Sequence, residues 1–151
     1  MNFEKNQLRE LKISGSGTSA GGNFDGVSIN GSGNIYGDTK CNDFKISGSG
    51  GVEGNLKCKS GKISGSAKIL GAVDSEEFKI SGFVKIEGDL KGKDINISGS
   101  AKILGSIYGE DIKISGGINV EKNIETDNFQ MTGNFKSKGM LNAENVNIYL
   151  G

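Results

Sequence analysis

The side chains that most often carry out chemistry are sparse in this sequence. It contains 18 Lys+Arg, of which Arg9 is the one arginine, and it has no histidine. Its two cysteines, Cys41 and Cys58, stand 17 positions apart. Two thiols without histidine make a poor zinc site, because structural zinc normally takes four cysteine or histidine ligands. We therefore predict no metal site, and we expect both cysteines to be reduced and to fill space in the core.

Two short motifs resemble binding loops only in part. Gly61-Lys62 matches the end of a phosphate-binding loop, but Ile63 stands where serine or threonine would hold magnesium. The segment Gly21-Gly22-Asn23-Phe24-Asp25 resembles a calcium-binding repeat but occurs once. We therefore predict no cofactor and no catalytic residue, and we expect that the chain is not an enzyme.

The dominant feature of the sequence is an internal repeat of 17 residues. A shorter step of 16 residues joins the first repeat to the second. Short periods of this kind indicate solenoids or arrays. A column of apolar residues, most of them the isoleucine of a recurrent I-S-G motif, marks the period: Ile13, Ile29, Ile46, Ile63, Ile80, Ile97, Ile114, Met131 and Ile148.

Numbering each repeat from position 1 at Val27 places this isoleucine at position 3. Odd positions are apolar or small and even positions are mostly polar, which is the alternation typical of a β-strand. Glycine recurs at positions 5 and 11, where we expect corners whose backbone angles other residues resist. Aspartate or asparagine recurs at position 17 and predicts a third corner.

These columns predict an all-β fold, a single-stranded parallel β-helix. Three strands per turn would form a triangular solenoid with 17-residue turns and about eight turns. The solenoid domain spans residues 11–151, after a short polar N-terminal tail at residues 1–10. Because each turn buries its apolar residues only against its neighbours, stability should grow turn by turn.

The outward positions offer two lysine columns, at positions 2 and 8. Acidic residues also number 18, so the net charge is +0 and the basic excess of a nucleic-acid binder is missing. We therefore expect no nucleic-acid partner and interpret the lysines as a solvated surface. Four large side chains also point outward and suggest a lateral surface for a protein partner: Tyr36, Leu70, Leu104 and Tyr108.

The two ends of the solenoid are the candidate interaction sites. The last repeat places Val146, Ile148 and Leu150 on a strand that nothing in the sequence covers, and the first repeat begins with Leu11 and Ile13. Exposed strand edges are usually covered by a helix, a loop, charge or proline, and the sequence has no proline. These five residues are therefore the predicted polymerisation interface, through which copies would stack into a filament.

The repeat K-I-S-G-S-A-K-I-L-G and the opening L-K-I-S-G-S-G-T-S-A-G-G-N-F-D-G-V-S-I-N-G-S-G-N-I-Y-G-D resemble the bactofilins, in particular the short Gram-positive forms. The resemblance covers residues 11–151. It implies a right-handed β-helix that assembles without nucleotide into non-polar cytoskeletal filaments through paired like ends. Such filaments act as scaffolds for other proteins.

Many bactofilins bind membrane through a short tail with a Met-Phe start, and this chain begins Met1-Asn2-Phe3. The resemblance thus implies a membrane contact at Met1 and Phe3. With no secretion signal and no apolar run long enough for a membrane helix, we expect a cytoplasmic protein associated with the inner face of the cell membrane. The alternative function is a non-polymerising β-helical binding module that presents its lateral face to a protein partner.

Overall fold

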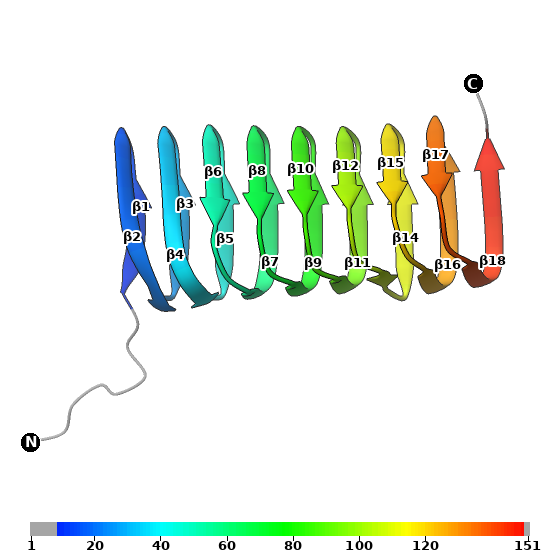
Figure 1. The fold of residues 1–151 in the computed structure, drawn as a ribbon, viewed down its shortest axis with the longest axis horizontal. Helices are drawn as coiled ribbons and strands as arrows, with labels where there is room; N and C mark the ends of the chain where they lie inside the picture. Colours follow the sequence, from blue (N-terminus) through cyan, green and yellow to red (C-terminus); the bar gives the residue numbers. More distant parts are fainter. Residues whose placement is uncertain (1–8, 150–151) are drawn as a thin grey trace, which may run out of the picture.

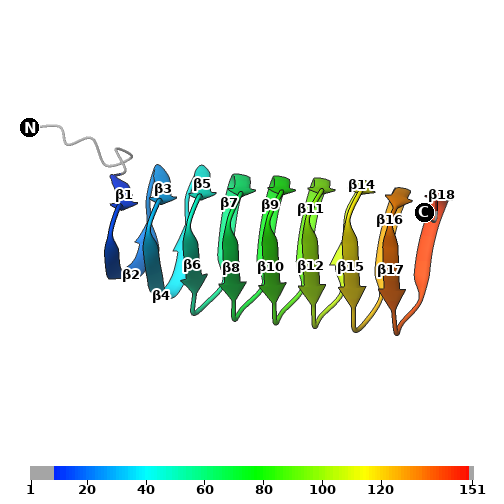
Figure 2. The same ribbon diagram turned by 90° about the horizontal axis from the view of Figure 1, so that it is seen from above.

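The computed structural model describes residues 9–149, which form a solenoid of about eight turns. All regular structure in this range is β-strand, and the turns stack side by side along one axis (Figure 1). The same stacking is seen from above in Figure 2. The predicted all-β solenoid is therefore confirmed.

The eighteen strands follow the chain in order. Their bounds are β1 Glu10–Ile13, β2 Ser16–Asn23, β3 Gly26–Ile29, β4 Ser32–Lys40, β5 Asp43–Ile46, β6 Ser49–Val52, β7 Leu56–Ile63, β8 Ser66–Ile69, β9 Val73–Ile80, β10 Phe83–Ile86, β11 Leu90–Ile97, β12 Ser100–Ile103, β13 Ile107–Tyr108, β14 Asp111–Ile114, β15 Gly117–Val120, β16 Ile124–Thr132, β17 Asn134–Ser137 and β18 Leu141–Tyr149.

Every pairing between turns is parallel, and from β3 and β4 onward the partners keep the 17-residue period. Ile80 pairs with Ile63 on one side and with Ile97 on the other, so partners lie 17 residues apart. The first turn is one residue shorter: Ile13 pairs with Ile29, and the register shifts between Ala20 and Gly22. The isoleucine column is thus a continuous ladder, as the spacing predicts.

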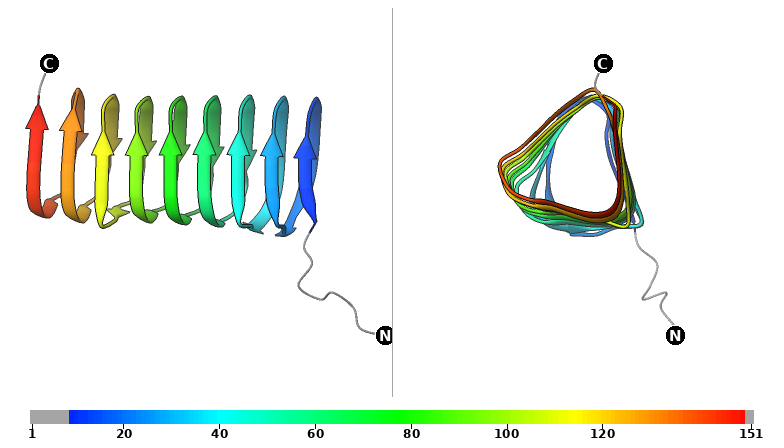
Figure 3. Two further views of the ribbon diagram at one scale, coloured as in Figure 1. Left: turned by 180° about the vertical axis from the view of Figure 1, so that it is seen from behind. Right: turned by 90° about the vertical axis from the view of Figure 1, so that its right-hand side faces the viewer.

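Viewed along its axis, the solenoid has a triangular outline (Figure 3, right). We name its sides by repeat position: face 1 holds positions 17 to 3, face 2 holds positions 6 to 9, and face 3 holds positions 13 to 15. Face 2 is formed by β6, β8, β10, β12, β15, β17 and the first halves of β2 and β4. Inward side chains from the three faces form one buried core along the axis.

The third corner differs from the prediction of three separate strands. β7, β9, β11, β16 and β18 run through it without interruption, and in the last four of these strands positions 16 and 17 are two successive exposed residues. A bent strand keeps most ladder hydrogen bonds on both sides of the corner. Positions 16 and 17 therefore project outward together.

The expected reason for the position-5 glycines is also corrected. Positive φ occurs within the described residues only at Gly22, Gly37 and Gly133. At Gly82 a Cβ would instead overlap the carbonyl oxygen of Gly65 in the preceding turn. Close approach of one turn to the next therefore requires glycine at most of these corners, and among the position-5 glycines only Gly133 also has a positive φ.

Candidate functional site: the terminal turns and the lateral faces

The C-terminal end of the described chain is an open strand edge with apolar side chains. β18 pairs with β16 and β17 pairs with β15, and neither has a second partner within residues 9–149. Val146 and Ile148 on β18 are 46% and 39% exposed. Both were predicted as interface residues, and the structure places them together on this edge.

Other apolar groups surround this edge. Phe135 on β17 is partly buried and packs on Phe129, with ring centroids 5.3 Å apart. Met140 and Tyr149 are exposed. The C-terminal edge therefore combines free backbone hydrogen-bonding groups with an apolar surface, which is the arrangement of an assembly surface.

The N-terminal end has a different character. Leu11 and Ile13 lie on β1, which pairs with β3 only within the described residues. Leu11 is partly buried against the core, and Ile13 is buried. The rest of this turn, β2, is the small and polar stretch SGTSAGGN. The structure thus brings the predicted residues Leu11 and Ile13 together, on a less apolar end than the C-terminal one.

A ladder of asparagine side chains runs along the corner between faces 3 and 1. Asn128 donates from Nδ2 to Asp111 Oδ1 at 2.7 Å, and Asn145 donates in the same way to Asn128 Oδ1 at 2.8 Å. Such ladders stabilise stacked strands. The last rung, Asn145, projects from the open edge of β18, so the edge offers a polar anchor beside its apolar side chains.

Three residues of the predicted interaction sites lie outside the described residues. Leu150 belongs to the predicted polymerisation interface, and Met1 and Phe3 to the predicted membrane contact. Their assignments stay predictions.

The two cysteines occupy adjacent turns at position 15, facing inward. Both are buried free thiols, as predicted. Contact with Cys58 and burial raise the pKa of the Cys41 thiol far above its ordinary range. A thiol held protonated is a poor nucleophile and a poor metal ligand. Residues 9–149 contain no group of three or more metal-ligating side chains.

Face 2 carries a feature that the sequence reasoning missed. Phe83 on β10 occupies an outward position and is 45% exposed. Beside it is a shallow hollow of about 410 Å³, with Lys102 and Lys136 among its lining residues. Asn119 lies between these lysines, and its buried Oδ1 accepts no hydrogen bond. Aligning position 6 would have revealed Phe83, because serine dominates that column.

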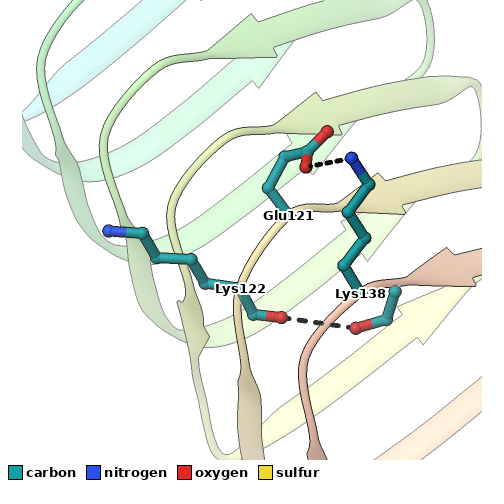
Figure 4. A network of polar contacts seen from close by, with 4 residues as sticks. Glu121, Lys122 and Lys138 are labelled. Carbon is teal, nitrogen blue, oxygen red and sulfur yellow. Dashed lines mark hydrogen bonds and ion pairs between the residues drawn. The ribbon is translucent and has the colours of Figure 1, made fainter.

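An ion pair joins two turns at the second corner, next to the C-terminal part of face 2. Lys138 Nζ lies 2.9 Å from Glu121 Oε2 and lowers the pKa of that carboxyl. Figure 4 shows the two side chains meeting across adjacent turns, whereas the Lys122 amine points away. Lys122 contributes its carbonyl oxygen, which accepts a hydrogen bond from Ser137 Oγ at 3.3 Å. These contacts tie the last turns together at the second corner.

The comparisons with known proteins give one short match. A stretch of 37 residues, 24% of this chain, is 51% identical to the uncharacterized protein YhbE of Bacillus subtilis (strain 168). The match covers 16% of the length of that protein. No family model matches the sequence, and no solved structure matches it.

The β-solenoid is compatible with a bactofilin-like fold and with a structural or scaffold role. None of the described elements is a helix of the length and apolar character needed to cross a membrane. The candidate interaction surfaces of the described chain are therefore its two open ends and its lateral faces.

Proposed function

We propose that this protein is a bactofilin-like, non-catalytic scaffold that assembles end to end into filaments without nucleotide. The observation that carries the proposal is the open edge of β17 and β18, where Val146 and Ile148 are exposed beside unpaired backbone groups. The resemblance to bactofilins supports it further.

Joining two C-terminal ends would cover both the free backbone groups and the apolar side chains of this surface. The backbone groups of two β18 edges would gain hydrogen-bond partners, and the apolar side chains would leave water. Complete burial of an aliphatic side chain contributes about 1.5–3 kcal/mol, so a half-exposed Val146 or Ile148 would add roughly 1 kcal/mol each. No metal, nucleotide or catalytic group enters this process.

Like ends fit each other better than unlike ends. The C-terminal turn is apolar, with Phe135, Leu141, Val146 and Ile148, whereas the N-terminal turn presents the polar β2. An apolar surface is stabilised most by another apolar surface. In such a filament each C-terminal end pairs with a second C-terminal end, and each N-terminal end pairs with a second N-terminal end through Leu11 and Ile13. The filament then has no overall polarity.

The test compares two substitutions on one strand. In Ile148→Asp a charge would be desolvated at the junction, so we expect a folded protein that forms no filaments by electron microscopy. Asn147→Asp places the same charge at the next position, which is outward, and should still polymerise. Filaments of Ile148→Asp as long as those of the wild type would show that the C-terminal turn is not a junction.

The alternative is a non-polymerising binding module. The exposure of Phe83 on face 2, and of Tyr36 and Leu70 at the neighbouring position 10, favours a lateral protein partner. Wild-type protein that stays monomeric at high concentration by analytical ultracentrifugation would support this function and exclude the filament. Leu104, also predicted to point outward, is partly buried at position 10.

We further propose a cytoplasmic location at the inner face of the membrane, through Met1 and Phe3. A single aromatic anchor binds weakly, so attachment would depend on many tails along one filament. Deleting residues 1–5 should abolish co-sedimentation of polymerised protein with liposomes. Unchanged co-sedimentation would exclude the tail as the membrane contact.

A further inference from the structure

The charges on face 3 form bands of one sign per turn. Position 14 lies on this face and position 16 at its corner, and the charged side chains at both are exposed. In four turns the two positions carry the same charge: Lys57 with Lys59, Asp74 with Glu76, Lys91 with Lys93, and Glu125 with Asp127.

A shallow groove separates the two columns. Its floor is made by the small residues of position 15, including Gly92 and Gly109. A hollow of about 410 Å³ lies over the middle turns, with Asp74, Glu76, Lys91, Lys93, Tyr108 and Glu110 along its sides. A second hollow, of about 610 Å³, continues it between Glu125 and Asp127. Positions 14 and 16 are therefore two ridges of one surface.

The sign of the bands reverses about the middle of the rod. From the turn of Lys40 to that of Glu144, the bands are basic, basic, acidic, basic, acidic, acidic and acidic. Consider a second copy of the rod, related to the first by a half-turn about an axis that is parallel to the strands and lies between the turns of Glu76 and Lys93. Its acidic bands then face the basic bands of the first copy. The facing pairs would be Asp74–Lys91, Glu76–Lys93, Lys59–Glu110 and Lys40–Glu125.

We propose that face 3 is a lateral interface through which a second copy of this chain binds antiparallel, with its turns in reversed order. Each of the four pairs occurs twice by symmetry. Lys57 faces Tyr108, whose ring attracts a cation. One pair is unfavourable, Asp25 with Glu144, and it lies at the outer margin. Within residues 9–149 none of these charges forms an ion pair in the single chain.

The band order selects one register. A shift by one turn in one direction places Lys91 on Lys91 and Glu76 on Glu110, and a shift in the other direction places Asp74 on Asp74. A parallel pair in register superposes position 14 on position 16 of the same turn, so that Lys57 meets Lys59. Like charges in direct contact disfavour the wrong arrangements.

The pairing is electrostatic and therefore weak between single rods at high ionic strength. Exposed ion pairs individually contribute little. Screening acts over about 10 Å at 0.1 M salt and about 3 Å at 1 M. Face 3 pairing does not require end-to-end assembly, but filaments would multiply the contacts along their length.

The first test is zero-length carbodiimide cross-linking of the wild-type protein at low ionic strength, with the linked peptides identified by mass spectrometry. We expect Lys59–Glu110 and Lys40–Glu125 links, which disappear at 1 M salt. Within one rod these residues are three and five turns apart, about 14 and 24 Å at ~4.8 Å per turn. The links must therefore join two chains, and end-to-end contacts leave the same residues far apart.

The second test exchanges one charge pair. Lys59→Glu should reduce the lateral association constant roughly tenfold, since two exposed attractive pairs become repulsive. The double variant Lys59→Glu/Glu110→Lys should recover it. Lys62→Glu changes the same charge on face 1 and serves as the control in sedimentation equilibrium. Absence of both cross-links, an equal loss in Lys62→Glu, or no recovery in the double variant would each overturn the proposal.

Discussion

The turn that contains Ile80 and the turn that contains Ile148 have the same repeat pattern but different surroundings. Phe78 and Ile80 are 0% and 1% exposed, whereas Val146 and Ile148 at the same positions are 46% and 39% exposed. The difference comes from neighbours: β9 lies between β7 and β11, and β18 has one partner within the described residues. In this fold burial is a property of stacking, not of the repeat itself.

The largest expected difference between the two turns concerns a buried charge. Ile80→Asp removes an isoleucine from the core, which alone costs about 2–5 kcal/mol, and adds an unpaired carboxylate. Because a whole domain is stable by only about 5–15 kcal/mol, we expect the middle turns to unfold. Ile148→Asp should cost only about 1–2 kcal/mol in the monomer, since the side chain is half-exposed and the carboxylate stays in water.

Chemical denaturation followed by circular dichroism measures this difference. Lys79→Asp, which is outward on the same strand as Ile80, is the matched control and should be tolerated. Equal loss of stability in Ile80→Asp and Ile148→Asp would show that the last turn is covered in solution.

A second difference between covered and open turns concerns the position-5 glycines. A Cβ at Gly82 would overlap the Gly65 carbonyl oxygen, whereas a Cβ at Gly15, in the first turn, meets nothing within 4 Å. Gly82→Ala should therefore destabilise the protein by about 1–3 kcal/mol, the usual range for overpacking. Gly15→Ala should be neutral or slightly stabilising. Thermal unfolding of both variants compares them, and equal melting temperatures would contradict close stacking as the reason for glycine.

The inward columns were predictable from the sequence because alternation and period alone determine which side chains face the axis. Ile29, Ile80 and Phe129 are buried where the pattern places them. Because the sequence pattern does not contain the distance between turns, the overlap at Gly82 and the continuous strands through the third corner appear only in the structure.

The candidate site was predictable in part for the same reason. Val146 and Ile148 follow from an apolar column that reaches the last turn. The bands on face 3 are present in the sequence, but their meaning depends on positions 14 and 16 flanking one groove. That placement results from the bent third corner, which the sequence reasoning did not anticipate.

A smaller difference is expected at the second corner, where side chains satisfy backbone N–H groups of the next turn. Ser106 donates its N–H to Asp89 Oδ1 at 2.7 Å, and Met140 donates to Asn123 Oδ1 at 2.9 Å. Ser106 is buried, whereas Met140 is exposed to water. Asp89→Ala should therefore cost about 1–3 kcal/mol through an unsatisfied buried donor, and Asn123→Ala under about 0.5 kcal/mol.

Amide hydrogen exchange at Ser106 and Met140 reports these two bonds directly. Asp89→Asn keeps the accepting oxygen and should preserve both stability and protection of Ser106. Equal costs for Asp89→Ala and Asn123→Ala would mean that the open end shields Met140 from water.

The smallest expected effect is the titration of Glu121, which faces the last turns. The hydrogen bond from Lys138 lowers the pKa of this carboxyl, so its stabilising contribution is present above the ordinary glutamate pKa and is lost as the pH falls through the lowered value. Lys138→Met should raise the pKa of Glu121 toward its ordinary value, as measured by NMR titration of the carboxyl carbon. Lys122→Met removes a neighbouring amine that points away (Figure 4) and should leave the titration unchanged. An unchanged Glu121 pKa in Lys138→Met would show that the last turn does not hold Lys138 against Glu121 in solution, and that it is loosely attached to the covered turns.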